Sequence, residues 1–334
     1  MRPFSYVRAR TVEQAVSAAS PTGAQFVAGG TTLVDLMRLE VMRPPVLVDI
    51  TALPLDAVEA HGDGVRVGAM ARNSDVAHHP LIERRFPALA QALRSGASPQ
   101  VRNMATVGGN LLQRTRCPYF RDLATACNKR EPGAGCAAIG GYTRSHAVLG
   151  TSDHCIATHP SDMAVALVAL DAVIHVRSVT GSRAIAAADF HTAPGGRPDV
   201  ETVLRPGELI THVDLPASPM AARSRYVKVR DRASFAFALA SAAVAVELRD
   251  GAITGARVAL GGVATRPWRS REAEQALVGQ PVGPETFRRA ADAALAAARP
   301  QRDNRFKVEL ARRTLVRALG LATGSDRVAR GGAP

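Results

Sequence analysis

The four cysteines of this 334-residue chain all lie between residues 106 and 162, at Cys117, Cys127, Cys136 and Cys155. Nine, eight and eighteen residues separate them, and the stretch is rich in glycine and proline with little hydrophobic periodicity. A loop of this length inside a compact domain is usually functional or disordered. Because every thiol of the protein is confined to it, we interpret the stretch as a functional loop.

Four thiols in one loop are compatible with several kinds of site. Two disulfides are disfavoured, because no signal peptide is visible and a chain of this size does not need such crosslinks. A four-cysteine zinc site usually contains a closely spaced cysteine pair, and this sequence has none. An iron–sulfur cluster also takes four thiolates, and the Cys117-Pro118 pair is similar to the Cys-Pro of bacterial ferredoxin motifs. Four unrelated buried cysteines are the remaining alternative, which the polar surroundings disfavour.

Two glycine-containing turns have the composition of a phosphate-binding site. The first follows a short apolar strand and consists of Val27, Ala28, Gly29, Gly30, Thr31, Thr32 and Leu33. The second includes Thr106, Gly108, Gly109 and Asn110. Backbone N–H groups that converge on one point bind phosphate without a charged side chain, and two facing turns could hold a diphosphate from both sides. Each is also compatible with an ordinary tight turn, and the G-x-G-x-x-G motif of the Rossmann fold is absent.

Local signals predict the elements around these motifs. Thr11 is a plausible N-cap of a first helix, with Gln14 completing a capping box. We expect a helix from about residue 81 to 93, and a further helix that Ser161 caps. A hairpin is predicted around Thr180-Gly181, a strand over 207–216, and two strands that turn at Asp250-Gly251. Three amphipathic helices follow between residues 271 and 320.

The cysteine-containing stretch resembles the FAD-binding subunit of molybdenum-containing aldehyde oxidoreductases of the xanthine dehydrogenase family. The segments NLLQRTRCPYFRD and HCIATHPSDMAVAL make the resemblance specific, and it extends from the opening PFSYVRA to the C-terminal helices. The chain is most similar to the periplasmic aldehyde oxidoreductase type, whose FAD subunit has an inserted loop that holds a [4Fe-4S] cluster. The resemblance implies that the four cysteines ligate such a cluster and that both glycine turns bind FAD.

The resemblance also implies roles for residues outside these motifs. Asp162 and Ile210 occupy positions that the family uses against the flavin, and Lys228 would lie close enough to stabilise negative charge on the reduced ring. Without the resemblance, Lys228 would be interpreted as a surface strand residue. His154 and His159 flank Cys155 and are at most indirect partners of a cluster. No catalytic residue is expected in this chain.

The implied fold class is α+β. A two-part FAD-binding fold of the vanillyl-alcohol-oxidase type (PCMH-like) would occupy residues 1–220, divided at about 1–55 and 56–220, with a [4Fe-4S] loop inserted at 111–160. A smaller domain with a sheet and three helices would cap the flavin over 221–325. Residues 326–334 are expected to form a disordered tail.

The implied function is electron transfer within a heterotrimer. A large subunit with the molybdenum cofactor would oxidise aldehydes to carboxylic acids, and a small subunit would carry two [2Fe-2S] clusters. This subunit would receive the electrons on FAD and pass them to an external acceptor. Two alternatives are a stand-alone flavoprotein dehydrogenase and a zinc-stabilised basic protein that binds nucleic acid.

Composition bears on partners and location. The formal charge is +13, but all except three of the 42 basic residues are arginines scattered along the chain, and only 4% of the residues are aromatic. We therefore expect no nucleic-acid partner. No apolar run is long enough for a membrane span. The lack of a signal peptide indicates the cytoplasm, whereas the resemblance implies export to the periplasm together with a partner subunit.

Overall fold

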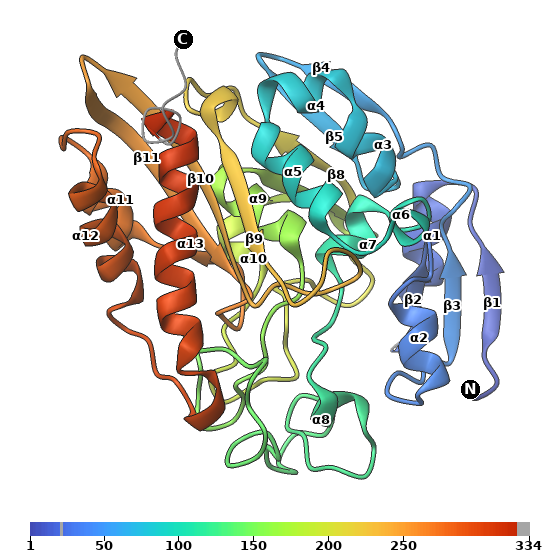
Figure 1. Cartoon of the computed structure of the whole chain (residues 1–334). Coiled ribbons are helices and arrows are strands. Elements are labelled where there is room, and N and C mark those ends of the chain that lie inside the picture. The colour runs from blue at the N-terminus through green and yellow to red at the C-terminus, as the bar shows by residue number, and fades with distance from the viewer. Residues whose placement is uncertain (21–22, 326–334) are drawn as a thin grey trace.

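The computed structural model describes residues 1–20 and 23–325, and the expected disordered tail lies outside this part of the chain (Figure 1). The described residues form three sheets with helices packed around them. The expected α+β class is therefore confirmed. None of the described helices is both long and apolar enough to cross a membrane.

The first sheet is parallel and has the strand order β1-β3-β2. Its strands and the two helices beside them are β1 (Ser5–Arg8), α1 (Val12–Ala18), β2 (Gln25–Val27), α2 (Leu33–Arg38) and β3 (Val46–Asp49). The predicted helix start is confirmed, since the Thr11 side chain accepts a hydrogen bond from the Gln14 amide.

The second sheet is antiparallel and has the order β4-β5-β8-β6-β7. Its strands are β4 (Val58–His61), β5 (Gly64–Gly68), β6 (Val173–Ser178), β7 (Gly181–Ala186) and β8 (Leu209–Leu215). The associated helices are α3 (Asn73–His78), α4 (Pro80–Arg85), α5 (Pro87–Ser95), α6 (Pro99–Arg102), α7 (Val107–Leu111), α9 (Asp162–Ala169) and α10 (Ala187–Phe190). The hairpin at Thr180-Gly181 is confirmed, because Ser178 pairs with Gly181.

The prediction of a single helix from about residue 81 to 93 is wrong. The structure has two helices there, which are separated at Phe86. Pro87 has no backbone N–H to continue the first helix, and it restricts the residue before it. Phe86 accordingly leaves the helical region, with φ −136° and ψ 56°.

The third sheet is antiparallel and has the order β12-β11-β10-β9. Its strands are β9 (Arg225–Val229), β10 (Ala240–Arg249), β11 (Ala252–Gly261) and β12 (Trp268–Arg269). The three expected helices are present as α11 (Arg271–Leu277), α12 (Pro284–Leu295) and α13 (Phe306–Thr323), and Figure 1 shows them on one side of this sheet. Val244 of β10 packs in the core with these helices, and Ala243 faces the core that contains α9. Both faces of β10 are thus covered, which explains its continuous run of small and apolar residues.

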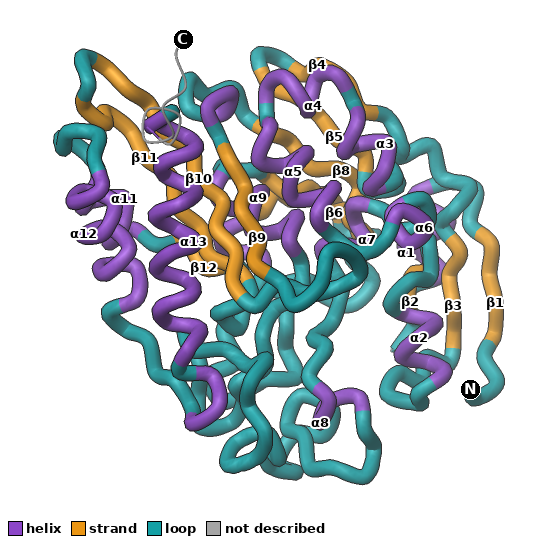
Figure 2. The backbone as a smooth tube through the Cα atoms, viewed as in Figure 1, coloured by secondary structure: helices purple, strands orange, loops and turns teal. Residues whose placement is uncertain are grey.

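The stretch between α7 and α9 contains one short helix, α8 (Pro118–Arg121), and is otherwise loop (Figure 2). We call residues 111–160 the cysteine loop. Its tip forms an isolated β-bridge between Cys127 and Cys136. Two short 3-10 helices complete the fold, Ala221–Arg223 before β9 and Arg302–Asn304 before α13. The division of the chain near residue 220 stays a prediction.

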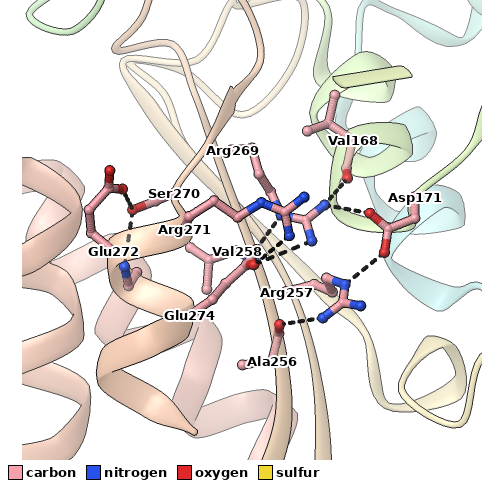
Figure 3. Close-up of polar contacts among 11 residues, drawn as sticks. Val168, Asp171, Ala256, Arg257, Val258, Arg269, Ser270, Arg271, Glu272 and Glu274 are labelled. Carbon is pink, nitrogen blue, oxygen red and sulfur yellow. Dashed lines mark hydrogen bonds and ion pairs between the residues drawn. The ribbon is translucent and has the colours of Figure 1, made fainter. Parts of the chain in front are cut away.

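A buried arginine connects α9 to the third sheet (Figure 3). Arg269 of β12 donates to the Val168 carbonyl at 2.7 Å and to Asp171 at 2.8 Å, at the C-terminal end of α9. The same guanidinium contacts Glu274 of α11, whose carboxylate also accepts a hydrogen bond from the Val258 amide. Only 7% of the Arg269 side chain is exposed.

Replacing Arg269 with alanine is expected to lower the free energy of unfolding by about 3–5 kcal/mol, because it leaves the Glu274 carboxylate buried without its main partner. Arg271 is a matched control: it also pairs with Glu274, but 62% of its side chain is exposed. We expect Arg271→Ala to cost less than about 1 kcal/mol. Equilibrium urea unfolding measures both, and equal losses would contradict the interpretation.

Candidate functional site

A cavity of about 540 Å³ lies where the first sheet meets the second, and we call it the main cavity. Residues of both predicted glycine segments line its wall, together with the buried Ile210 at the start of β8. The lining residues of the first segment are Ala28, Gly29, Gly30, Thr31, Thr32 and Leu33, and those of the second are Thr106, Gly108 and Gly109. The structure therefore brings together residues that are up to about 180 positions apart in the sequence.

The first glycine turn, residues 27–33, has the backbone that a phosphate site needs. Gly30 has φ +68°, which a side chain would disfavour. A Cβ atom on Gly29 would lie 1.9 Å from the carbonyl oxygen of Met104, so the first glycine turn touches the backbone just before the second glycine segment. Among the described residues, no acceptor bonds the backbone amides from Gly29 to Thr32. These amides are free to bind an anionic group.

The second glycine segment, residues 106–110, is a short helix and not the expected glycine turn. Thr106 caps α7 by accepting a hydrogen bond from the Gly109 amide, and the Gly108 amide donates to the Ala69 carbonyl. Asn110 accepts from Ser161 Oγ at 2.7 Å. Because these amides are already bonded, this segment shapes the wall of the main cavity, and Met104 just before it contacts the first turn.

A buried ion pair lies beside the start of α9. Ser161 caps this helix, as predicted, and Asp162 occupies its first turn. Lys228 Nζ donates to Asp162 Oδ2 at 2.7 Å and to the Ser95 carbonyl at 3.0 Å, and Tyr226 donates to Asp162 Oδ1 at 2.5 Å. Burial, together with the Asp162 charge, raises the pKa of Tyr226 well above its usual value.

The interpretation of Lys228 as a surface residue is wrong, because only 3% of its side chain is exposed. Asp162 lines a second cavity of about 230 Å³, which extends toward Cys117 and the loop before β10. The Lys228 charge is balanced by Asp162, so the two side chains act as one neutral unit. His159 lines both cavities and marks where they meet.

The four cysteines are grouped in one small core. Cys117, Cys127 and Cys155 are buried and Cys136 is partly buried, and all four are free thiols. Leu36 of α2 belongs to the same core. The cysteine loop is also tied to α2 by Asp35, which accepts two hydrogen bonds from Arg121 and one from Arg116. The helix after the first glycine turn thus supports the cysteine loop.

Each of the two cavities is lined by one of the cysteines. Cys155 lines the main cavity and Cys117 lines the second. Burial raises the pKa of Cys117 to about 12 and also raises that of Cys155. A buried thiol of this kind becomes a thiolate only when a bound cation compensates its charge. Without such a cation, Cys117 and Cys155 are therefore protonated thiols at neutral pH.

Sequence reasoning missed His146, whose Nε2 lies 3.2 Å from Cys117 Sγ. Burial lowers the pKa of His146 to about 4. Its carbonyl accepts a hydrogen bond at 2.9 Å from Lys307 of α13, a fully buried lysine. No local signal links residues this far apart in the sequence. His154, which was expected near the cysteines, is exposed.

The buried His191 and the partly buried His159 form a pair in the wall of the main cavity. Their rings are 4.3 Å apart in an edge-to-face arrangement. His191 Nε2 lies 2.9 Å from the Leu111 carbonyl and therefore carries the proton, which leaves Nδ1 as an acceptor with no partner among the described residues. Burial lowers the pKa of His191 to about 4 and that of His159 well below its usual value.

This pair predicts a loss of stability in acid. A buried neutral histidine stabilises the fold above its unfolded pKa, and the contribution is lost as the pH falls toward the folded value. For His191 the window runs from about pH 6.5 to about 4, and the loss is on the order of 3 kcal/mol. The charged neighbours Glu201 and Arg266 have smaller, opposing effects.

The variant His191→Gln keeps a donor for the Leu111 carbonyl but does not titrate. Its free energy of unfolding should therefore fall less than that of the wild type between about pH 7 and about pH 4.5. Urea unfolding of both proteins at the two pH values measures the difference. The same pH dependence in both would contradict a neutral His191 in the folded state.

Two family models match the chain. The FAD binding domain in molybdopterin dehydrogenase matches residues 2–218, and the CO dehydrogenase flavoprotein C-terminal domain matches residues 225–322. Among curated proteins, the chain is 49% identical to the aldehyde oxidoreductase FAD-binding subunit PaoB of Escherichia coli, over 96% of this chain and 99% of that protein. It is 29% identical to the glyceraldehyde dehydrogenase medium chain of Sulfolobus acidocaldarius, over 90% of each.

Solved structures show the same fold. Carbon monoxide dehydrogenase from Hydrogenophaga pseudoflava superposes with a TM-score of 0.76 at 27% identity, over 97% of this chain and 99% of that chain. Quinoline 2-oxidoreductase from Pseudomonas putida superposes with a TM-score of 0.75 at 23% identity, which supports the fold alone.

Proposed function

Because this chain belongs to the FAD-binding medium subunits of the molybdenum aldehyde oxidoreductase and carbon monoxide dehydrogenase family, we propose that it is the FAD- and [4Fe-4S]-carrying electron-transfer subunit of an aldehyde-oxidising complex. Its partners would be a large molybdenum-cofactor subunit and a small subunit with two [2Fe-2S] clusters. The observation that carries the proposal is the contact of a cysteine-lined core with a cavity that has a glycine-turn anion site.

The main cavity fits FAD in several respects. Its volume lies in the usual range for a ligand site. The free amides from Gly29 to Thr32 would hold the diphosphate, and the unpartnered Nδ1 of His191 offers an acceptor to a hydroxyl or N–H group. Ile210 presents an apolar surface, and the Asp162–Lys228 pair lies next to the adjoining cavity. When bound, FAD supplies hydride and one-electron chemistry, and the protein supplies its position and surroundings.

The cysteine core supports an iron–sulfur cluster over a zinc ion. Four thiolates around a tetrahedral zinc would be about 3.8 Å apart, given zinc–sulfur bonds of about 2.3 Å. Among the described residues, no three cysteine sulfur atoms lie within 4.8 Å of one another. A four-iron cluster holds its ligands farther apart, because each thiolate binds a different iron. Cys117, Cys127, Cys136 and Cys155 would be these ligands.

The chain's own residues bind and shield the cofactors. Cys155 lines the main cavity, so a cluster held by it would lie next to the flavin, which suits electron transfer. His159 and His191 lie in the same wall, and burial lowers the pKa of both, which favours their neutral forms. We assign no general base to this chain, so aldehyde oxidation itself would take place on the molybdenum subunit.

The proposal is tested by purifying the chain without oxygen and measuring its cofactors and activity. We expect one FAD and about four irons per chain. The isolated chain should transfer electrons from a chemical reductant to an acceptor dye, and it should oxidise aldehydes only after the two partner subunits are added. Aldehyde turnover by the isolated chain would indicate a stand-alone flavoprotein, and zinc without flavin would overturn the cofactor assignment.

A further inference from the structure

A second group of metal-ligating side chains lies on the outer face of the five-stranded sheet. His175 of β6 and His212 of β8 are direct cross-strand partners, and their rings stack at 4.2 Å. Asp214 follows two positions after His212 and so lies on the same face of β8. One ligand atom from each of these three side chains lies within 4.8 Å of the others. All three residues are half-buried.

Thr211 lies beside the other ring nitrogen of His212. Its Oγ1 is 3.2 Å from the His175 carbonyl, to which it can donate, and 3.0 Å from His212 Nδ1. In the tautomer with the proton on Nδ1, the hydroxyl accepts from Nδ1–H and a lone pair is left on His212 Nε2. This Nε2 atom is buried and has no hydrogen-bond partner in the part of the chain that the structure describes. A histidine whose second nitrogen is held by a neighbouring acceptor is typical of metal ligands.

The carboxylate is also held in place. Arg66 of β5 donates to both oxygens of Asp214, at 2.8 Å each, and His175 Nε2 lies 3.0 Å from Asp214 Oδ2. A carboxylate still has lone pairs available after a two-point contact with arginine. A His175 ring that carries one proton, on Nδ1, can offer its Nε2 lone pair to an ion. Arg66 then remains as the outer partner that orients the ligating carboxylate.

We propose that His175, His212 and Asp214 form a binding site for a divalent transition-metal ion such as Zn²⁺, with water completing the coordination. Two imidazoles and one carboxylate suit such ions, whereas Mg²⁺ and Ca²⁺ prefer oxygen ligands. Arg66 already pairs with the Asp214 carboxylate, so the site should bind zinc more weakly than the same ligands would without the arginine. The ligands come from the neighbouring strands β6 and β8, so the bound ion would crosslink these two strands.

This site is independent of the cysteine loop. The three ligands lie on the sheet face opposite Ile174, Val176 and Val213, which belong to the core. The proposal therefore does not depend on FAD or on the iron–sulfur cluster, and a zinc titration can separate the two kinds of site by mutation.

The test is a zinc titration by calorimetry, without oxygen, on the full chain loaded with FAD and iron. We expect one zinc per chain, with at least a tenfold loss of affinity in His212→Ala. His78→Ala is the matched control, because His78 is an exposed histidine that is not part of this group, and it should bind like the wild type. Absence of saturable binding to the wild type, or unchanged binding to His212→Ala, would overturn the proposal.

Two further variants test the same site if His212→Ala does not fold. Thr211→Val retains all three ligands and removes only the acceptor of His212 Nδ1–H, so we expect a loss of affinity of about 10–100-fold. Cys127→Ser should bind this zinc normally. Zinc binding that is lost in Cys127→Ser and kept in Thr211→Val would place the ion in the cysteine loop and refute the assignment.

Discussion

Cys127→Ser is expected to remove nearly all of the iron from the purified protein while FAD remains bound. A four-iron cluster requires four thiolate ligands, and a serine hydroxyl at a buried position is a poor replacement. Cys127 is 7% exposed and pairs with Cys136 through a β-bridge, so the bridge can persist without the metal. Iron analysis and the visible spectrum of the anaerobic protein measure the change, from about four irons per chain to less than about one.

The control for this variant is His154→Ala. His154 lies next to Cys155 but is exposed, and within residues 1–20 and 23–325 only its backbone is hydrogen-bonded. We expect it to retain full iron. If Cys127→Ser also keeps its iron, the four cysteines do not ligate a cluster. If it loses both iron and FAD, the cluster organises the main cavity as well, which the packing of Cys155 in its wall would explain.

Gly29→Ala should abolish FAD binding to the isolated chain, with a loss of affinity of at least 100-fold. The new Cβ would lie 1.9 Å from the Met104 carbonyl oxygen and 2.7 Å from its carbonyl carbon. Both atoms belong to the backbone, so a side-chain rotation cannot relieve the overlap, and the first glycine turn must separate from the backbone at Met104. Separation moves the free amides of the first turn, and overpacking of this kind also costs roughly 1–3 kcal/mol of stability.

Gly196→Ala is the matched control for the steric argument. A Cβ at Gly196 meets no atom within 4 Å, so we expect a change in stability of less than about 0.5 kcal/mol and unchanged flavin binding. FAD affinity is measured by fluorescence titration of the apoprotein, and stability by urea unfolding. Normal FAD affinity in Gly29→Ala would show that the first glycine turn does not bind the cofactor.

Much of the local structure could be predicted from short sequence patterns. The cap at Thr11, the cap at Ser161 and the hairpin at Thr180-Gly181 each depend on residues a few positions apart, so the responsible atoms are neighbours in the chain as well as in space. The expected helix over 81–93 failed for an equally local reason, since Pro87 interrupts the hydrogen-bond pattern that the apolar periodicity suggested.

The sequence by itself determined the family, the concentration of thiols in one loop and the glycine turn at residues 27–33. Only the tertiary structure decided which groups meet across long separations. Lys228 pairs with Asp162, which is 66 residues away in the sequence, and His146 contacts Cys117, which is 29 residues away. Neither contact has a local signal, because it depends on how separately formed sheets and helices pack. The chemistry of a buried charge or thiol is set by these distant neighbours and by the exclusion of water, which no short pattern encodes.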